Sequence, residues 1–241
     1  MLLLYPYHLY SKVINLQYEI DWKTVHIADI FWNISFDDKE YQIEFLIESY
    51  GLTDKIYNYE SLTTVSGLIE NENLKPLKYR SKTTSSNQDV FAFIDFNEDG
   101  SILNLDISKE IGNEQIIMQA EFIEKYLNFT DPISQLSQYF LFNKNSDRLI
   151  IDGLNIYALS SKKLQSIEFK KNNPTLYTGF SNTLKLTFPF FQGLHKLEKK
   201  NNIKEIIMYH SYIYDTNIPV QYDIFSKKFN AKLYLKNIDV N

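Results

Sequence analysis

The stretch "YQIEFLIE", residues 41–48, indicates the fold because apolar and polar side chains alternate along it. Tyr41, Ile43 and Phe45 occupy every second position, and Gln42 and Glu44 stand between them. Successive side chains of a β-strand point to opposite faces of its sheet. The pattern is therefore typical of a strand with one buried face and one solvated face.

The same alternation extends outward from this stretch over residues 16–22 and 30–36, and strand-like segments resume from Arg148 onward. Turn-forming residues at 37–39 and 71–73 favour hairpins, which predict antiparallel pairing. A flat sheet of so many strands is unfavourable. We therefore expect one mainly β domain over residues 13–241, with a strongly twisted antiparallel sheet curled as a β-roll or incomplete barrel.

Residues 113–142 interrupt the β pattern, and we expect a short helical insert there. The stretch 113–129 predicts an amphipathic helix from apolar residues near helical spacing, namely Ile116, Ile117, Ala120, Ile123 and Leu127. We expect this helix, together with the one predicted after it, to cover one end or face of the sheet.

A second helix is predicted to begin at Pro132, with Asp131 as its N-cap. A carboxylate at the N-cap accepts a backbone N–H that is otherwise unpaired, and proline at the first helical position loses nothing by lacking its own N–H. Ile133, Leu136 and Phe140 would then share the apolar face of this helix.

Composition excludes several classes of function. The 241 residues carry 25 Lys and Arg against 30 Asp and Glu, a net charge of −5, so a nucleic-acid-binding surface is not expected. The absence of cysteine excludes disulfides, thiol catalysis and cysteine-bound zinc. We expect no cofactor, since no glycine-rich phosphate loop occurs.

The first ten residues, "MLLLYPYHLY", are apolar but too short to span a membrane, and no later segment reaches that length. They lack the basic start of a secretory signal. We interpret residues 1–12 as the remnant of a signal peptide or as a loose edge of the sheet.

The segment "DFNEDGSILNLD", residues 95–106, has nearly the spacing of a calcium loop through Asp95, Asn97 and Asp99. A calcium loop of this type needs a helix on each side, but both flanks alternate like strands. The sequence "NEDG" also fits a tight turn that ends in glycine. We therefore predict a hairpin turn and no metal site, with the calcium site as the alternative.

Two other groups of residues are candidate functional sites. His210 and Asp215 are close enough in sequence to form the histidine–carboxylate pair of a hydrolase, although a buried structural histidine is the simpler interpretation. Phe188, Phe190 and Phe191 flank Pro189, which predicts a strand end or loop bearing an apolar patch. That patch would bind a ligand or partner, or would close the core.

Three short motifs resemble an uncharacterised domain-of-unknown-function family of Gram-negative envelope proteins. They are "LKPLKYRSKT" at 74–83, "DPISQL" at 131–136, and the late pair Pro219 and Val220. The resemblance covers residues 14–238 and implies a mature, mostly antiparallel β protein of the periplasm, with no established activity and no catalytic residues to transfer. This chain departs from the family in its short N-terminal segment and in Ile218, where many members carry a charge.

Together these observations predict a non-catalytic periplasmic protein of the cell envelope that binds a lipid, a glycan or another envelope protein. A hydrolase using the His210 and Asp215 pair is the alternative. The sequence contains no assembled nucleophile and base, which favours the binding protein.

Overall fold

The computed structural model describes residues 12–86, 88–111, 114–117, 128–144, 148–171, 173–193 and 203–241. Its first eight strands are β1 (Lys12–Trp22), β2 (Val25–Phe36), β3 (Glu40–Ser49), β4 (Glu60–Glu70), β5 (Asn73–Ser85), β6 (Gln88–Phe96), β7 (Ile102–Ile111) and β8 (Glu114–Ile117). The other strands are β9 (Phe129–Thr130), β10 (Leu149–Ile151), β11 (Asn155–Phe169), β12 (Gly179–Gly193), β13 (Ile203–Ile213), β14 (Thr216–Ser226) and β15 (Asn230–Val240). The described residues also form two helices, α1 (Gly51–Tyr57) and α2 (Pro132–Phe142).

All fifteen strands belong to one sheet, in the order β8-β7-β6-β5-β4-β3-β2-β1-β15-β14-β13-β12-β11-β10-β9. Within the series β1 to β8 each strand pairs with its neighbours along the chain, and the same holds within the series β9 to β15. The two series meet where β1 pairs with β15. All pairs are antiparallel except β9 with β10, which are joined through α2, as a parallel pair requires.

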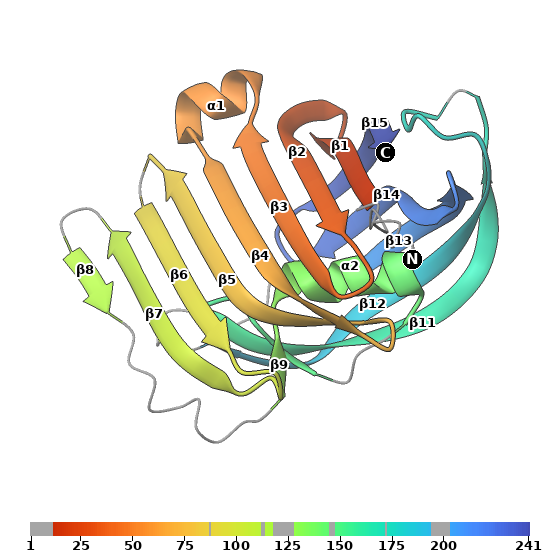
Figure 1. The fold of residues 1–241 in the computed structure, drawn as a ribbon. Coiled ribbons are helices and arrows are strands. Elements are labelled where there is room, and N and C mark those ends of the chain that lie inside the picture. Colours follow the sequence, from red (N-terminus) through yellow and green to blue (C-terminus); the bar gives the residue numbers. More distant parts are fainter. Residues whose placement is uncertain are drawn as a thin grey trace, which may run out of the picture.

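The sheet curls into a nearly closed barrel, which confirms the predicted fold class (Figure 1). Contacts between its two ends hold the curvature. The backbone N–H of Phe129 in β9 donates to the carbonyl of Gly100, in the turn between β6 and β7, at 2.8 Å. Gly153 lies so close to β6 that an added Cβ would come within 2.4 Å of the Ala92 Cβ.

The predicted hairpins at residues 37–39 and 71–73 are confirmed. Asp37 closes the first turn, because its Oδ1 accepts the backbone N–H groups of Lys39 and Glu40 at 2.7 and 2.8 Å. These two bonds lower the pKa of the Asp37 carboxyl. In the second turn Asn71 and Glu72 both have positive φ, as a tight hairpin requires.

Helix α2 lies in the hollow of the barrel (Figure 1). Its predicted start is confirmed: Asp131 is the N-cap, Pro132 follows it, and the Asp131 Oδ1 accepts the N–H groups of Ile133 and Ser134, each at 2.9 Å. Most of the helix is buried, and Tyr41 from β3 reaches it with its Oη 2.7 Å from the Ser134 Oγ. The helix therefore covers part of the inner face of the sheet.

The helix predicted over residues 113–129 is wrong at both ends. Residues 114–117, which include Ile116 and Ile117, form strand β8, paired with β7, and Phe129 belongs to β9. Ala120, Ile123 and Leu127 lie outside the described residues. Four residues of mixed apolar character fit either period, and pairing with the neighbouring strand decides in favour of β structure.

Helix α1 connects β3 to β4 at the upper end of the barrel in Figure 1. None of its residues is buried, and Leu52 and Ile56 are exposed. It is held at its ends: the Tyr50 N–H donates to the Ile27 carbonyl at 2.8 Å, and Asn58 ends the helix in the left-handed conformation.

Among the described residues, no helix has the length and apolar character needed to cross a membrane.

Candidate functional site

The largest cavity of the described structure lies inside the barrel at the end that carries α1. Its volume is about 710 Å³. Strands β1, β2, β3, β13, β14 and β15 form its walls, with α2 on one side and α1 at the mouth. Almost all of the lining residues are aliphatic or aromatic, including Ile20, Ile30, Phe45, Ile47, Ile224 and Leu233.

These residues point inward because apolar and polar side chains alternate along the strands. A cavity remains because the inward side chains are less tightly packed toward α1 than at the other end. Ile34 and Ile43, on the inner face away from α1, are both fully buried. Further toward α1 the inward residues Phe45 and Ile47 are only partly buried, and they line the cavity. Leu136 of α2 is likewise partly buried although its helix lies inside the barrel.

Aromatic residues that pack against one another form the wall of the deep part of the cavity. The Trp32 ring packs edge-on against Phe45 and Phe140, with centroids 5.0 and 5.2 Å apart. Tyr18 donates through its Oη to the Pro219 carbonyl at 2.8 Å and packs against Tyr222 at 6.0 Å. Burial raises the pKa of both tyrosines, so both remain neutral phenols at physiological pH. The cavity wall therefore carries no charge in this region.

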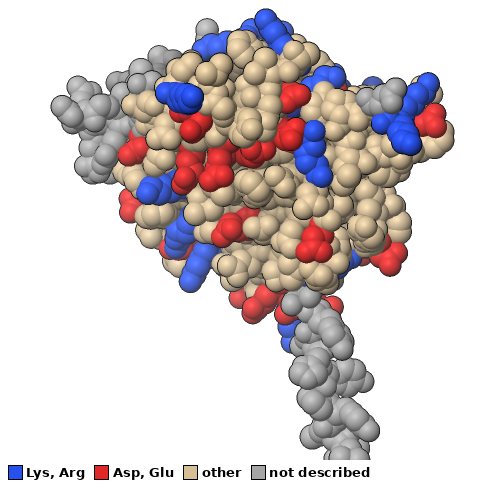
Figure 2. Space-filling view, turned by 90° about the horizontal axis from the view of Figure 1, so that it is seen from above, with Lys and Arg blue, Asp and Glu red and all other residues tan. Residues whose placement is uncertain are grey.

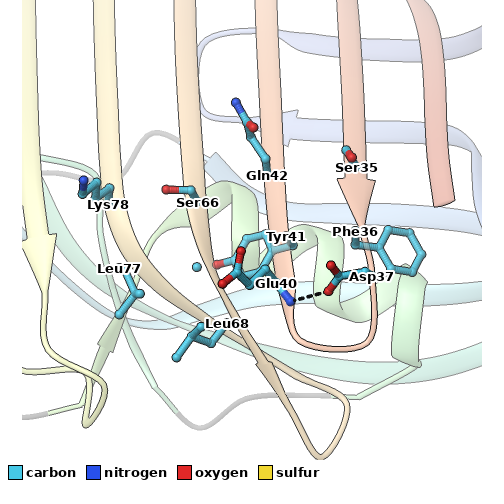
Figure 3. Close-up of a pocket in the computed structure, with 11 residues that line it drawn as sticks. Ser35, Phe36, Asp37, Glu40, Tyr41, Gln42, Ser66, Leu68, Leu77 and Lys78 are labelled. Carbon is cyan, nitrogen blue, oxygen red and sulfur yellow. Dashed lines mark hydrogen bonds between the residues drawn. The ribbon is translucent and has the colours of Figure 1, made fainter. Parts of the chain in front are cut away.

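A second hollow, of about 400 Å³, lies on strands β2 to β5 near the opposite end (Figure 3). It is open and partly polar: Glu40 and Gln42 from β3, Ser66 from β4 and Lys78 from β5 lie around it. Asp37 also lines it, but the β2–β3 turn already uses that carboxylate. The apolar cavity inside the barrel is therefore the better candidate for a binding site.

His210 and Asp215 occupy different environments. His210 lies on β13, buried, and lines a small cavity of about 110 Å³ with Lys163 and Asn182. Burial and the positive charge of Lys163 lower the pKa of His210, while a hydrogen bond with Asn217 opposes them. Asp215 lies exposed in the β13–β14 turn, and no contact joins it to His210 within the described ranges. The geometry does not assemble a hydrolase pair from these two residues.

The three phenylalanines at 188–191 lie on β12 and do not line the large cavity. Phe188 and Phe191 pack near the Tyr157 ring of β11, at 5.8 and 6.4 Å between centroids, and Phe190 packs against the core. Pro189 was expected at a strand end or in a loop. It instead lies within β12, opposite a bulge in β11 and beyond the stretch of β12 that pairs with β13.

Residues 95–106 form the predicted hairpin between β6 and β7. The Asp99 Oδ1 accepts from the Ser101 N–H and Oγ, at 2.8 and 2.6 Å, and the Asn97 Nδ2 donates to the same hydroxyl at 2.9 Å. Asp95 forms an ion pair with Arg80, which lowers the pKa of the Asp95 carboxyl. In the part of the chain that the structure describes, no three His, Cys, Asp or Glu residues group as metal ligands would.

The cavity residues were not identified from the sequence. The alternation showed correctly that Phe45 and Ile47 face inward, but a core residue and a cavity residue give the same pattern.

Comparison with known proteins gives a family match over part of the chain. Residues 17–127 match the model of a family described as "Protein of unknown function (DUF3108)". The resemblance to an uncharacterised domain-of-unknown-function family is thereby confirmed for this range, which contains residues 74–83. The motifs at 131–136 and 219–220 lie outside it. No curated protein matches the chain.

One solved structure that is similar over nearly the whole chain is the crystal structure of a beta-barrel-like protein of domain of unknown function DUF1849 from Brucella abortus. It is 7% identical, with a TM-score of 0.45, and the alignment covers 97% of this chain and 98% of that chain.

Proposed function

We propose that this protein binds the hydrocarbon part of a lipid inside its barrel, without catalysis. The observation that carries the proposal is the apolar cavity of about 710 Å³ beside Leu136. This volume falls within the range of roughly 300–1,000 Å³ found for small-molecule sites. Burying a hydrocarbon chain there would remove apolar surface from water on both the ligand and the cavity wall.

The chemistry of the wall selects among the three ligand classes expected from the sequence. A glycan needs several polar groups to replace its hydrogen bonds with water, and burying it against Ile20, Phe45 and Leu233 would leave those bonds unmade. A protein partner would need an exposed surface, whereas this site lies inside the barrel. A flexible apolar chain suits the space best.

We also propose that the protein works in the periplasm of a Gram-negative bacterium. The support is the family resemblance of the motifs at 74–83, 131–136 and 219–220, together with the apolar residues 1–10. Cell fractionation of a tagged protein, expressed from its native genomic context, tests this. Recovery in the osmotic-shock fraction is expected, and recovery with the cytoplasmic proteins would contradict the proposal.

The binding proposal is tested by displacing a bound fluorescent probe, N-phenylnaphthylamine, with octanol, decanol and dodecanol. Each added methylene contributes about 0.8 kcal/mol when it is buried, so the dissociation constant should fall by up to about fourfold per methylene. The series uses neutral head groups so that only the chain is tested. No displacement, or no dependence on chain length, would contradict lipid binding.

Two variants test whether the ligand binds in the cavity. Ala28→Leu and Ala231→Leu each add side-chain volume to the wall. A leucine would displace about two methylenes of the bound chain, so roughly tenfold weaker dodecanol binding is expected. Ala158→Leu, on β11 and away from the cavity, is the matched control and should bind as the wild type does. Equal affinity in all four proteins would place the alcohol elsewhere.

A further inference from the structure

A groove at the rim of the barrel shares three lining residues with the apolar cavity. Its volume is about 340 Å³, and it lies between the β1–β2 turn and the β14–β15 turn. Ile224, Phe229 and Ala231 line both spaces. The two strands that carry the rim are neighbours, since Trp22 of β1 lies opposite Ala231 of β15. A molecule in the cavity could therefore extend into the groove past Phe229.

The groove differs from the cavity in its charge. Three lysines line it: Lys23 in the β1–β2 turn, Lys228 in the β14–β15 turn and Lys232 on β15, all exposed. One acidic residue lines it, Asp223, which is 8% exposed. The three lysines outnumber this one carboxylate, although the whole chain carries a net charge of −5.

The contacts of Asp223 reduce its effect on an incoming anion. Its Oδ1 accepts from the Gln221 Nε2 at 2.7 Å and lies 3.9 Å from the Lys232 Nζ, and its Oδ2 accepts from the Tyr209 Oη at 3.1 Å. The carboxylate is therefore already surrounded by donors. Lys23 and Lys228 remain on the two turns that form the mouth of the groove.

Aromatic residues stand beside these lysines. Trp22 and Phe229 are 46% and 47% exposed, large fractions for apolar side chains, and the Lys23 Nζ lies 5.4 Å from the Trp22 ring centroid. The end of the molecule that carries this rim is seen in Figure 2, where wide uncharged areas lie among groups of basic and acidic residues. Apolar rings next to ammonium groups match the boundary between a hydrocarbon chain and an anionic head group.

We propose that the ligand is an anionic amphiphile, whose chain occupies the cavity and whose carboxylate or phosphate head group binds in the groove at Lys23 and Lys228. This inference rests on the proposed lipid binding and adds the chemistry of the head group. The ammonium groups supply positive charge, which the cavity wall lacks.

The test compares three ligands of equal chain length: dodecanoate, dodecanol and dodecylammonium. We expect dodecanoate to bind about tenfold more tightly than dodecanol, since hydrogen bonds to a charged group add to chain burial, and dodecylammonium to bind more weakly than either. Dodecyl phosphate should behave like dodecanoate. Equal affinity for all of them would overturn the inference and leave chain binding intact, whereas failure of dodecanol to bind would count against lipid binding itself.

The double variant Lys23→Ala/Lys228→Ala tests whether the head group binds in the groove. It should lose the preference for dodecanoate and retain the wild-type affinity for dodecanol, which also shows that the cavity is folded. The matched control is Lys162→Ala/Lys171→Ala, which removes two exposed lysines from β11 and the following turn and should keep the preference. A preference that survives in the groove variant would overturn the assignment.

Acetate and inorganic phosphate supply the same head-group charge without a chain. Neither should displace dodecanoate at equal concentration, because the groove alone offers only a few exposed lysines. Displacement by either small anion would mean an anion site independent of the cavity and would also overturn the inference.

Discussion

The Oδ1 atom of Asp131 lies 2.9 Å from the backbone nitrogen of Ser134, and the same oxygen accepts the Ile133 N–H. The Oδ2 atom is buried and has no hydrogen-bond partner among the described residues. One carboxylate thus both starts the helix inside the barrel and carries an uncompensated oxygen in the core. These two roles have separable effects on stability.

Removing the cap should destabilise the protein. Asp131→Asn keeps an oxygen that can accept the two N–H groups, and Asp131→Ala does not. Because neither variant is charged, their difference isolates the cap: Ala should be less stable by about 0.5–2 kcal/mol. Asp131→Ser should recover most of the loss through its hydroxyl. Chemical denaturation measures the three free energies of unfolding, and equal values would show that α2 does not depend on this cap.

The buried charge should make stability depend on pH. Burial raises the pKa of Asp131 to about 6, above its value of 3.8 in the unfolded chain. The folded state then binds more protons at Asp131 than the unfolded state between these values. The contribution of Asp131 to stability is therefore highest at low pH and is lost as pH rises through the folded pKa. Relative to Asp131→Asn, the wild type should lose up to about 3 kcal/mol over this interval, since one unit is worth about 1.4 kcal/mol.

Unfolding curves of the wild type and Asp131→Asn across this pH interval provide the measurement. Titration of the other groups is common to both proteins and cancels in the difference. A constant difference at every pH would mean that the Asp131 carboxyl titrates as an ordinary exposed group.

Gly67 should not tolerate a side chain. A Cβ at this position would lie 2.0 Å from the Lys75 carbonyl oxygen and 2.8 Å from the Pro76 Cα, both of them backbone atoms. Strands β4 and β5 would have to separate, and overpacking of this kind costs about 1–3 kcal/mol. Gly67→Ala should therefore lower the melting temperature, while Ser66→Ala on the same strand changes it little. Equal melting temperatures would show that the strands can shift freely.

The hairpin at 95–106 should bind no calcium with micromolar affinity. Arg80 engages the Asp95 carboxylate, and Ser101 engages that of Asp99, so neither is available without breaking existing contacts. Isothermal titration with calcium chloride should give no saturable heat. A saturable signal that disappears in Asp95→Ala would establish the alternative site.

Most of the strands could be predicted because their faces have unequal environments. In β3, Tyr41 and Ile43 are buried, whereas Gln42 and Glu44, which alternate with them, are exposed. The two-residue period of the strand is therefore visible in the sequence. Asp131 and Pro132 predicted the start of α2 equally well, because helix capping depends only on residues that are adjacent in the sequence. Residues 114–117 were assigned wrongly because four residues cannot distinguish the two periods and pairing with β7 decides their structure.

The site was harder to predict than the fold because a cavity depends on the space that side chains leave unfilled. Phe45 and Ile43 look alike in the sequence, and only the curvature of the sheet separates the filled end of the barrel from the hollow one. For His210 and Asp215, closeness in sequence left a contact open as the alternative to a buried structural histidine. A hairpin places His210 on a buried strand and Asp215 in its exposed turn.

The pairing of β1 with β15 determines the order in which the barrel can be assembled during synthesis. Asn15 and Asp239 lie side by side in this pair, although 224 positions separate them in the chain. The strands on each side can form hairpins with their neighbours as they leave the ribosome, but the seam between the two series must wait for residues 230–240. Until then β1 and β14 are open edges, which favour aggregation. We therefore expect closure of this seam to be the slow step of folding, because contacts between distant residues form slowly.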